Sequence, residues 1–175
     1  MKKIIFFDGD GTLWYPESTG HTIAPQWIYA DKEIGSNYLK HMVVIPPVLE
    51  ILKKLKKQRL TMVILSTHPH SPKEAIKVLK AKIDYFQIGN FFDSYHALQA
   101  DPDQKGKMIL KILKEKGIPK SQALMIGDSY RYDYLSAQKV GVDALLIKTP
   151  YMKHPPRGPK ISKTIKSIKE VLNYL

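Results

Sequence analysis

Hydrophobic residues gather in short continuous runs that alternate with longer amphipathic stretches. The clearest runs cover residues 3–7, 60–65, 123–126 and 144–147 and are rich in Ile, Leu and Met. Continuous apolar runs of this length predict β-strands that are buried on both faces. A weaker run at 85–88 predicts one more strand.

In the stretches between these runs, apolar residues recur every three or four positions and lysines occupy the opposite side. This period predicts amphipathic helices. The predicted helices begin near Pro46 and after Ser71 and then cover 105–116, 132–140 and, as a basic C-terminal helix, 161–175. Ser71 can cap the helix that starts with Pro72, and Gly117 is suited to end the helix at 105–116.

Residues 15–45 show neither period and contain Pro16, Gly20, Pro25 and Gly35. They predict an irregular insertion, with at most a short helical or hairpin piece. About thirty residues are too few for an independently packed domain. We therefore expect residues 1–175 to form a single domain.

Strands that alternate with helices predict an α/β fold, a Rossmann-like three-layer α/β/α sandwich with a mostly parallel central sheet. Ligands of such sheets bind beyond the carboxyl ends of the strands. Three of the predicted strands end in polar residues, at Asp8, Ser66 and Asp128. We expect these three side chains to lie along one edge of the sheet.

The composition is that of an ordinary globular protein, with 43% hydrophobic and 25% charged residues. No stretch approaches the ~20 apolar residues of a membrane-spanning helix, so no membrane association is expected. The apolar run after Met1 is also too short for a signal peptide, which favours a cytoplasmic location. The absence of cysteine excludes disulfides, thiolate metal sites and a cysteine nucleophile.

The net charge of +12 comes almost entirely from lysine, since arginine occurs only at positions 59, 131 and 157. A basic surface attracts phosphates of many kinds, including nucleic acids, phosphoproteins and sugar phosphates. Arginine forks and interleaved aromatics, which would favour nucleic acid more strongly, are scarce. Nucleic-acid binding is therefore possible but not required, and a lysine-rich solvated surface explains the charge equally well.

The segment Asp8-Gly9-Asp10-Gly11-Thr12 places two carboxylates directly after a buried strand. Glycines let the backbone loop and leave amides free to contact an anion. Phosphoryl transfer through a covalent intermediate needs a carboxylate nucleophile and a proton donor for the leaving oxygen. Asp8 can attack, while Asp10 can protonate the leaving group and later activate water. An acidic turn without catalytic function is the alternative.

Other polar residues at the predicted edge fit the same chemistry. Ser66 can bind a phosphate oxygen, or it can be a simple turn residue. Lys105 and Lys107 open a helix and can balance phosphate charge, or they can be surface charges. Asp128 offers the oxygen ligand that a hard cation prefers, although it could also cap the helix that follows.

These segments together resemble the four motifs of the haloacid dehalogenase superfamily, in their family order. The matches are Asp8, Asp10 and Thr12 for the first motif, Ser66 for the second, Lys105 with Lys107 as fallback for the third, and Gly127, Asp128 and Asp133 for the fourth. The opening Asp-Gly-Asp-Gly-Thr-Leu-Trp is similar to the magnesium-dependent phosphatase-1 branch. Gly9 departs from the usual apolar residue, and Lys105 lacks the proline that often follows it.

The resemblance implies a Mg²⁺-dependent phosphatase, a hydrolase of phosphomonoesters with an aspartyl-phosphate intermediate on Asp8. Asp10 would be the general acid/base, and family members that split carbon–halogen bonds lack an acid there. The metal ligands would be Asp8, the backbone carbonyl of Asp10, and Asp128, with Asp133 beside them or joined through water. Phosphate would be bound by Thr12, Ser66, Thr67 and Lys105.

The spacing of the motifs also leaves no room for a separate cap domain, so the site would be open or covered only by the insertion at 15–45. Family members without a cap often act on large substrates or close the site with a neighbouring subunit. We expect a monomer or homodimer acting on a phosphoprotein with phosphotyrosine, or on a sugar phosphate. Two rival hypotheses are a non-enzymatic phosphoacceptor domain and a phosphatase or binding module for nucleic-acid ends.

Aromatic and histidine side chains of the insertion could contact the substrate or simply pack against the domain. These are Tyr15, His21, Trp27, Tyr29 and His41. His68 and His70 follow Ser66 and are expected near the site. A zinc site there is disfavoured, because magnesium with oxygen ligands already accounts for the acidic residues.

Overall fold

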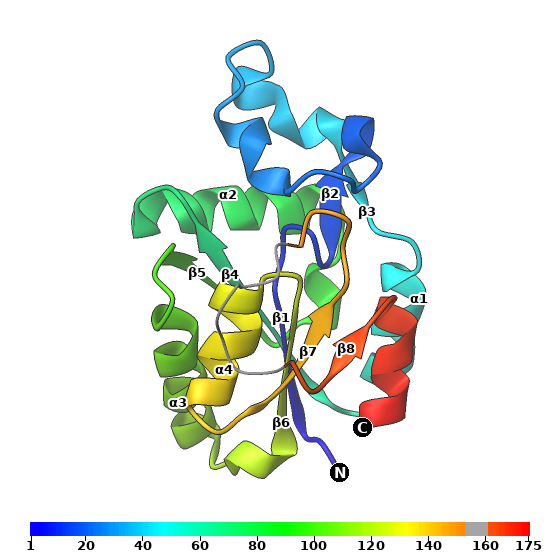
Figure 1. The fold of residues 1–175 in the computed structure, drawn as a ribbon, viewed down its shortest axis with the longest axis vertical. Helices are drawn as coiled ribbons and strands as arrows, with labels where there is room; N and C mark the ends of the chain where they lie inside the picture. Colours follow the sequence, from blue (N-terminus) through cyan, green and yellow to red (C-terminus); the bar gives the residue numbers. More distant parts are fainter. Residues whose placement is uncertain (153–160) are drawn as a thin grey trace.

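The computed structural model describes residues 1–152 and 161–175, and a parallel sheet runs through the middle of this part of the chain (Figure 1). Its strand order is β5-β4-β1-β6-β7-β8, and every neighbouring pair is parallel. The strands are β1 (Ile4–Phe7), β4 (Thr61–His68), β5 (Ser94–Gln99), β6 (Ala123–Gly127), β7 (Asp143–Ile147) and β8 (Thr164–Ile165). The predicted Rossmann-like α/β architecture is confirmed.

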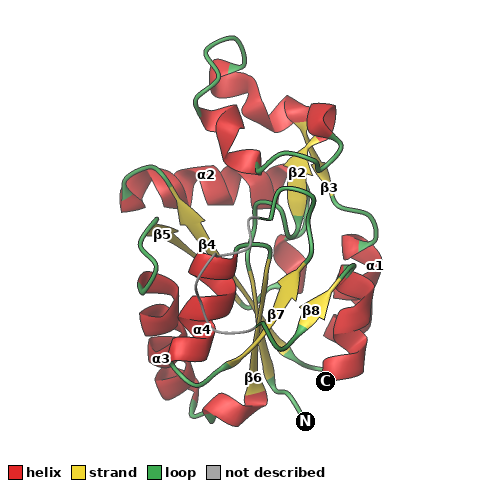
Figure 2. Ribbon diagram, viewed as in Figure 1, coloured by secondary structure: helices red, strands yellow, loops and turns green. Residues whose placement is uncertain are grey.

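Helices cover both faces of the sheet (Figure 2). One layer holds α1 (Val48–Lys57), α2 (Pro72–Tyr85) and the 3₁₀ helix Ile168–Tyr174, and the other holds α3 (Gln104–Lys116) and α4 (Leu135–Lys139). Because successive side chains of a strand point to opposite faces, Ile5 and Phe7 pack in the first layer, and Ile4 and Phe6 in the second. This two-sided burial explains why β1 is apolar at every position.

The two helix ends predicted from capping residues, at Ser71 and Gly117, are confirmed. Ser71 Oγ accepts a hydrogen bond of 3.4 Å from the backbone N–H of Glu74, at the start of α2. Gly117 follows α3 with φ of 63°, a left-handed conformation that glycine adopts without strain. The helix predicted at 132–140 starts as a π-helix, Tyr130–Tyr134, before it continues as α4.

The strand predicted at 85–88 is wrong. Tyr85 is the last residue of α2, and the backbone N–H of Phe86 still bonds to the Lys82 carbonyl. The apolar residues here bury against the domain core as the chain leaves the helix. The additional strand is instead β5, which was expected to be loop. β5 lies at the edge of the sheet and is half-exposed, so its sequence lacks the continuous apolar run of a central strand.

The C-terminal segment also differs from the single helix predicted at 161–175. Thr164 and Ile165 form β8, which pairs with the end of β7. The chain then turns at Ser167, whose side chain and that of Glu170 form a capping box for the 3₁₀ helix Ile168–Tyr174. A β-branched pair beside an open sheet edge explains why strand pairing replaces the first helical turn.

The insertion (residues 15–45) stands over the carboxyl edge of the sheet, next to α2 (Figure 1). It starts and ends in a small antiparallel sheet of β2 (Trp14–Pro16) and β3 (Met42–Val44). Three 3₁₀ helices lie between them: Glu17–Thr19, Pro25–Tyr29 and Gly35–His41. Ile28 and Met42 are buried in the same apolar cluster as the sheet, so the insertion shares the core of the domain.

No helix of the described residues combines the length and the apolar character that crossing a membrane requires.

Candidate active site

A tight turn after β1 carries Asp8 and Asp10 to the carboxyl edge of the sheet. The Gly9 carbonyl accepts a 2.8 Å hydrogen bond from the Leu13 N–H, which closes the turn. Gly11 has φ of 83°, and a Cβ placed on it would lie 2.3 Å from Asp128 Oδ2. Only glycine fits there, because the backbone must approach the carboxylate of Asp128 directly.

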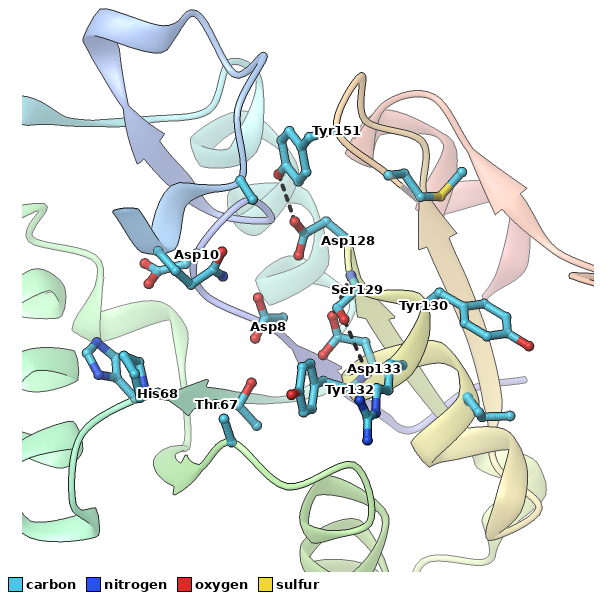
Figure 3. A pocket seen from close by; sticks show the side chains of 17 residues that line it. Asp8, Asp10, Thr67, His68, Asp128, Ser129, Tyr130, Tyr132, Asp133 and Tyr151 are labelled. Carbon is cyan, nitrogen blue, oxygen red and sulfur yellow. Dashed lines mark hydrogen bonds between the residues drawn. The ribbon is translucent and has the colours of Figure 1, made fainter. Parts of the chain in front are cut away.

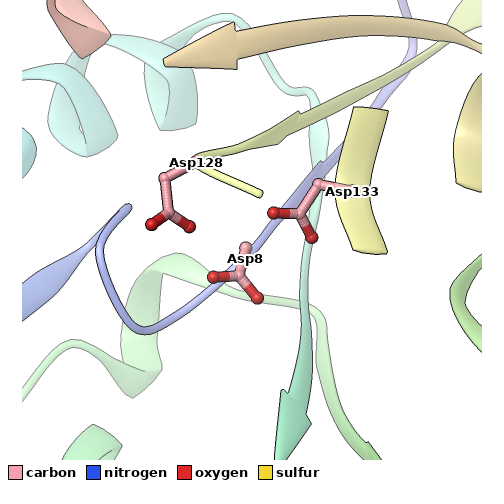
Figure 4. A group of neighbouring side chains, drawn as sticks. All are labelled: Asp8, Asp128 and Asp133. Atoms are coloured by element: carbon pink, nitrogen blue, oxygen red, sulfur yellow. The ribbon is translucent and has the colours of Figure 1, made fainter. Parts of the chain in front are cut away.

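Three buried carboxylates converge in front of this turn (Figure 4). Asp8, Asp128 and Asp133 each offer an oxygen, and these oxygens lie within 4.8 Å of one another. Asp128 follows β6, and Asp133 lies in the π-helix Tyr130–Tyr134, where the Ser129 N–H donates to it at 2.9 Å. The ends of two neighbouring strands and one helix thus build the cluster.

Lys105 supplies a positive charge to this cluster. Its ammonium, at the start of α3, donates to Asp8 Oδ1 at 2.5 Å and also to Asp133, and its side chain is fully buried. Lys107 is exposed. Of the two lysines left open by the sequence, the structure therefore brings Lys105 to the site.

The carboxylates outnumber the ammonium, and their protonation reflects this. Burial raises the pKa of Asp8 well above its usual value; Lys105 opposes that rise, whereas the charges of Asp133 and Asp128 add to it. Burial, together with Asp133, raises the pKa of Asp128 to about 7. Burial lowers the pKa of Lys105, but the Asp133 and Asp8 carboxylates outweigh it, and the net shift is upward.

An all-oxygen group with excess negative charge fits a hard divalent cation. Asp8 and Asp128 can each offer a carboxylate oxygen to such a cation. Both oxygens of Asp133 are already engaged, Oδ1 by the Lys105 ammonium and Oδ2 by the Ser129 N–H, whereas Lys105 engages only Oδ1 of Asp8, so Asp133 suits a place beside the ligands.

Asp10 faces a different set of partners. Its Oδ1 accepts hydrogen bonds of 2.5 Å from Trp14 Nε1 and 2.5 Å from Lys82 Nζ, and its Oδ2 accepts one from the Tyr29 hydroxyl. We call Trp14, Tyr29 and Lys82 the Asp10 donors. Burial raises the pKa of Asp10, but Lys82 and the Tyr29 hydrogen bond outweigh it, so the net pKa is lowered and the carboxylate is ionised.

Ser66, Thr67 and Thr12 have different surroundings. Ser66 is buried in β4, next to β1, with Oγ 3.2 Å from where a Cβ on Gly9 would lie. Thr67 lines the cavity in front of Asp8. Thr12 lies behind the turn, where its buried hydroxyl finds no hydrogen-bond partner among the described residues, and it lines a second cavity of about 280 Å³. Neither Thr12 nor Ser66 is among the residues that line the cavity in front of Asp8, so of these three only Thr67 lines it.

The cavity in front of Asp8 has a volume of about 680 Å³ (Figure 3). Asp8, Asp10, Asp128 and Asp133 line it together with residues from five segments of the chain. These contribute Ala24 and Gln26 of the insertion, Thr67 and His68 at the end of β4 with Pro69 after it, Ala100 after β5, Ser129, Tyr130, Arg131, Tyr132 and Leu135 after β6, and Tyr151 and Met152 after β7. The carboxylates therefore lie in a pocket with largely aromatic and apolar walls.

A family model described as "Haloacid dehalogenase-like hydrolase" matches residues 23–147, more than half of the chain. The chain belongs to this family. The matched region includes Ser66, Lys105, Asp128 and Asp133, and it begins after the turn that carries Asp8 and Asp10. The placement of those two residues therefore rests on the geometry described above.

Solved structures superimpose over nearly the whole chain. An uncharacterized protein from Listeria monocytogenes serotype 4b has a TM-score of 0.73 at 20% identity, covering 98% of this chain and 96% of that one. A HAD phosphatase from Thermococcus onnurineus has a TM-score of 0.71 at 18% identity, covering 99% and 97%. At this level of identity, the similarity concerns the fold.

Among curated sequences, a phosphoglycolate phosphatase of Pseudomonas fluorescens is 31% identical over 111 residues. The match covers 62% of this chain and 38% of the relative. The chain thus spans well under half the length of the curated relative.

Three side chains of this family member were not predicted from the sequence: Lys82, Trp14 and Tyr151. Lys82 had one signal, since it continues the buried stripe of Ala75 and Leu79 on α2, where a lysine is out of place. Tyr151 donates a 2.7 Å hydrogen bond to Asp128 Oδ2 and follows β7 at the same edge of the sheet. Trp14 was noted only as part of the opening Asp-Gly-Asp-Gly-Thr-Leu-Trp. Its indole contact with Asp10 depends on the conformation of the turn between them.

The aromatic and histidine residues of the insertion divide between the site, the core and the exposed surface. Tyr29 reaches Asp10, and His21 Nε2 lies 3.0 Å from the Gly11 carbonyl oxygen. Trp27 packs against the core, and His41 is exposed.

His68 and His70 pack on each other, with ring centroids 4.8 Å apart, and His68 also packs on Tyr29. Burial lowers the pKa of His68 to about 4. His68 thus lies on the Asp10 side of the pocket, away from the carboxylate cluster at Asp128 (Figure 3).

Proposed function

We propose that the protein is a magnesium-dependent phosphomonoester hydrolase in which Asp8 forms an aspartyl-phosphate intermediate. The observation that carries this proposal is the buried group of Asp8, Asp128 and Asp133, neutralised only in part by Lys105. A dianionic phosphate can approach such a group only when a cation offsets the charge.

In the first step, an Asp8 carboxylate oxygen attacks phosphorus and the bond to the leaving oxygen breaks. Asp10, ionised before the reaction, first takes up a proton from solvent and then gives it to that oxygen, so an alcohol departs. In the second step, water attacks the phosphorus of the aspartyl phosphate and loses its proton to Asp10. The bond to Asp8 breaks, which releases phosphate and restores the carboxylate.

Mg²⁺ would be held by the side chains of Asp8 and Asp128 and by the backbone carbonyl of Asp10, with Asp133 beside them. When bound, it supplies positive charge to the phosphoryl oxygens. Lys105 would hold Asp8 in place and balance the phosphate charge. Ser66 and Thr67, at the carboxyl end of the neighbouring strand, would bind the remaining phosphate oxygens.

For the substrate, we propose a phosphomonoester with a substantial apolar or aromatic leaving group, such as phosphotyrosine. The cavity of about 680 Å³ is larger than a phosphate needs, and Tyr132, Pro69 and Met152 line it. Sugar phosphates and phosphoglycolate, the substrate in the name of the curated relative, are the small-substrate alternatives.

The decisive experiment measures hydrolysis of an aryl phosphate by the wild type and by Asp8→Asn, with and without Mg²⁺. We expect turnover only in the wild type with metal. Equal rates in the two proteins, or rates that do not change when the metal is chelated, would contradict the proposal. A panel of phosphotyrosine peptide, sugar phosphates, phosphoglycolate and end-phosphorylated oligonucleotides then ranks the substrate classes by kcat/KM.

A further inference from the structure

We propose that Lys82 and Tyr29 are positioning residues that hold the Asp10 carboxylate for proton transfer to the leaving oxygen. The insertion that carries Tyr29 would then be part of the catalytic apparatus. This inference rests on the proposed function, because it needs Asp10 to act as the acid/base.

The Asp10 donors come from three separate parts of the chain. Trp14 belongs to β2, Tyr29 to the insertion and Lys82 to the end of α2, yet all three meet at one carboxylate. Lys82 also contacts the Tyr29 hydroxyl. Two donors bind Oδ1 and one binds Oδ2, so the carboxylate is restrained from both sides and its plane is fixed.

Burying the Lys82 ammonium costs free energy, because the charge loses its hydration. Its side chain is 2% exposed and occupies a position in the apolar stripe of α2 that a leucine or methionine would fill. A buried ion pair of this kind adds little net stability compared with an apolar pair of the same volume. Stability alone therefore does not account for this lysine, whereas control over a reacting carboxylate does.

The arrangement separates two tasks around Asp8. In Figure 3, Asp10 lies on one side of Asp8, and Asp128 and Asp133 lie on the other. Lys105 serves the Asp8 and Asp133 side, and Lys82 serves Asp10. Lys105 is thus paired with the proposed nucleophile, Asp8, and Lys82 with the proposed proton carrier, Asp10.

Proton transfer depends steeply on the geometry of donor and acceptor. A leaving alkoxide needs the proton of Asp10 far more than an aryl oxide does, because the aryl oxide is a stable anion. A loosened Asp10 should therefore slow the hydrolysis of alkyl phosphates much more than that of p-nitrophenyl phosphate. A general loss of folding would reduce both rates equally.

The test compares Lys82→Met with the wild type, using kcat/KM for an alkyl and for a p-nitrophenyl phosphate. This constant reports the steps up to release of the alcohol, in which Asp10 acts as acid. We expect a loss on the order of 100-fold for the alkyl phosphate, typical of a lost general acid, and a loss below about 10-fold for the aryl one. Lys80→Met, the same substitution at an exposed position of α2, is the matched control.

A double variant shows whether Lys82 acts through Asp10. If it does, adding Lys82→Met to Asp10→Asn should change kcat/KM by less than about 2-fold, since the partner is already lost. Tyr29→Phe removes one hydroxyl with little change of shape and should show the same preference for the aryl substrate, more weakly. It also serves as the test if Lys82→Met does not fold.

Three outcomes would overturn the positioning role. They are equal losses on the two substrates, independent losses that multiply in the double variant, and an unchanged alkyl-phosphate rate in Lys82→Met. In each case, a wild type that still needs Asp8 and Mg²⁺ would leave the proposed function intact. An inactive wild type would remove both.

Discussion

At the scale of single residues, the site is defined by carboxylates that the fold forces together. Asp128 is buried beside Asp133, and Asp8 is buried against both of them. The folded protein therefore keeps a proton on Asp128 up to about pH 7, far above the ordinary pKa of 3.8. A bound cation would remove the need for that proton, so metal binding and protonation should compete.

This competition predicts a pH-dependent stability of the metal-free protein. The folded state holds the Asp128 proton more tightly than the unfolded state. The stabilisation of the folded state by this proton is therefore complete below pH 3.8 and is lost as pH rises through about 7. Asp128→Asn removes this loss. In EDTA at pH 8, we expect the variant to be more stable than the wild type, by at most about 4 kcal/mol.

Urea unfolding at pH 4 and pH 8, in EDTA, measures the effect. At pH 4 the two proteins should be similar, and Mg²⁺ at pH 8 should stabilise the wild type more than the variant. Asp84→Asn, which changes an exposed carboxylate on α2, is the control. A variant that is less stable than the wild type at pH 8 without metal would contradict the prediction.

At the scale of elements, the site depends on how closely α3 approaches the segment that carries Asp133. Gly106 directly follows Lys105, and its N–H donates a 2.8 Å hydrogen bond to Ser136 Oγ of α4. A Cβ on Gly106 would lie 2.6 Å from the Ser136 carbonyl oxygen. The glycine thus lets α3 place Lys105 within reach of Asp8 and Asp133.

Gly106→Ala should therefore destabilise the protein by about 1–3 kcal/mol, because α4 must move away from α3. Intrinsic helix propensity alone predicts the opposite sign, since alanine favours a helix by about 1 kcal/mol over glycine. Chemical denaturation decides between the two. Lys107→Ala, at the next and exposed position, should change stability by no more than about 0.5 kcal/mol.

At the scale of the whole molecule, an acidic cavity lies within a strongly basic protein. The chain has 28 Lys and Arg against 16 Asp and Glu, yet Asp8, Asp10, Asp128 and Asp133 all line the same cavity. The surrounding positive charge should attract phosphate dianions to a site that would otherwise repel them. The charge then matters for substrate approach more than for the chemical step.

Salt should therefore raise KM for a phosphomonoester and leave kcat nearly unchanged. Between about 20 and 300 mM NaCl, we expect kcat/KM to fall by roughly 3- to 10-fold as screening shortens the reach of the surface charge. Steady-state kinetics with constant Mg²⁺ measures this, and inhibition by inorganic phosphate should weaken in parallel. A KM that stays constant across the series would show that the charge plays no part in substrate approach.

The sequence by itself determined the architecture and the edge of the sheet at which chemistry is possible. Continuous apolar strands can only be buried on both faces, and a parallel sheet sets their polar ends side by side. This was enough to place Asp8, Ser66 and Asp128 near one another. It was not enough for β5 or β8, because edge strands need no continuous apolar run and their pairing depends on a neighbour that is distant in the chain.

Only the tertiary structure decided which side chains contact one another at that edge. Lys105 and Lys107 are alike in the sequence, and the direction in which α3 faces the sheet buries one and exposes the other. Lys82 lies 72 residues from Asp10, and no local period connects the two. Such contacts depend on how α2 and the insertion pack around the turn after β1. This packing therefore also decides which side chains hold Asp10, the proposed proton carrier.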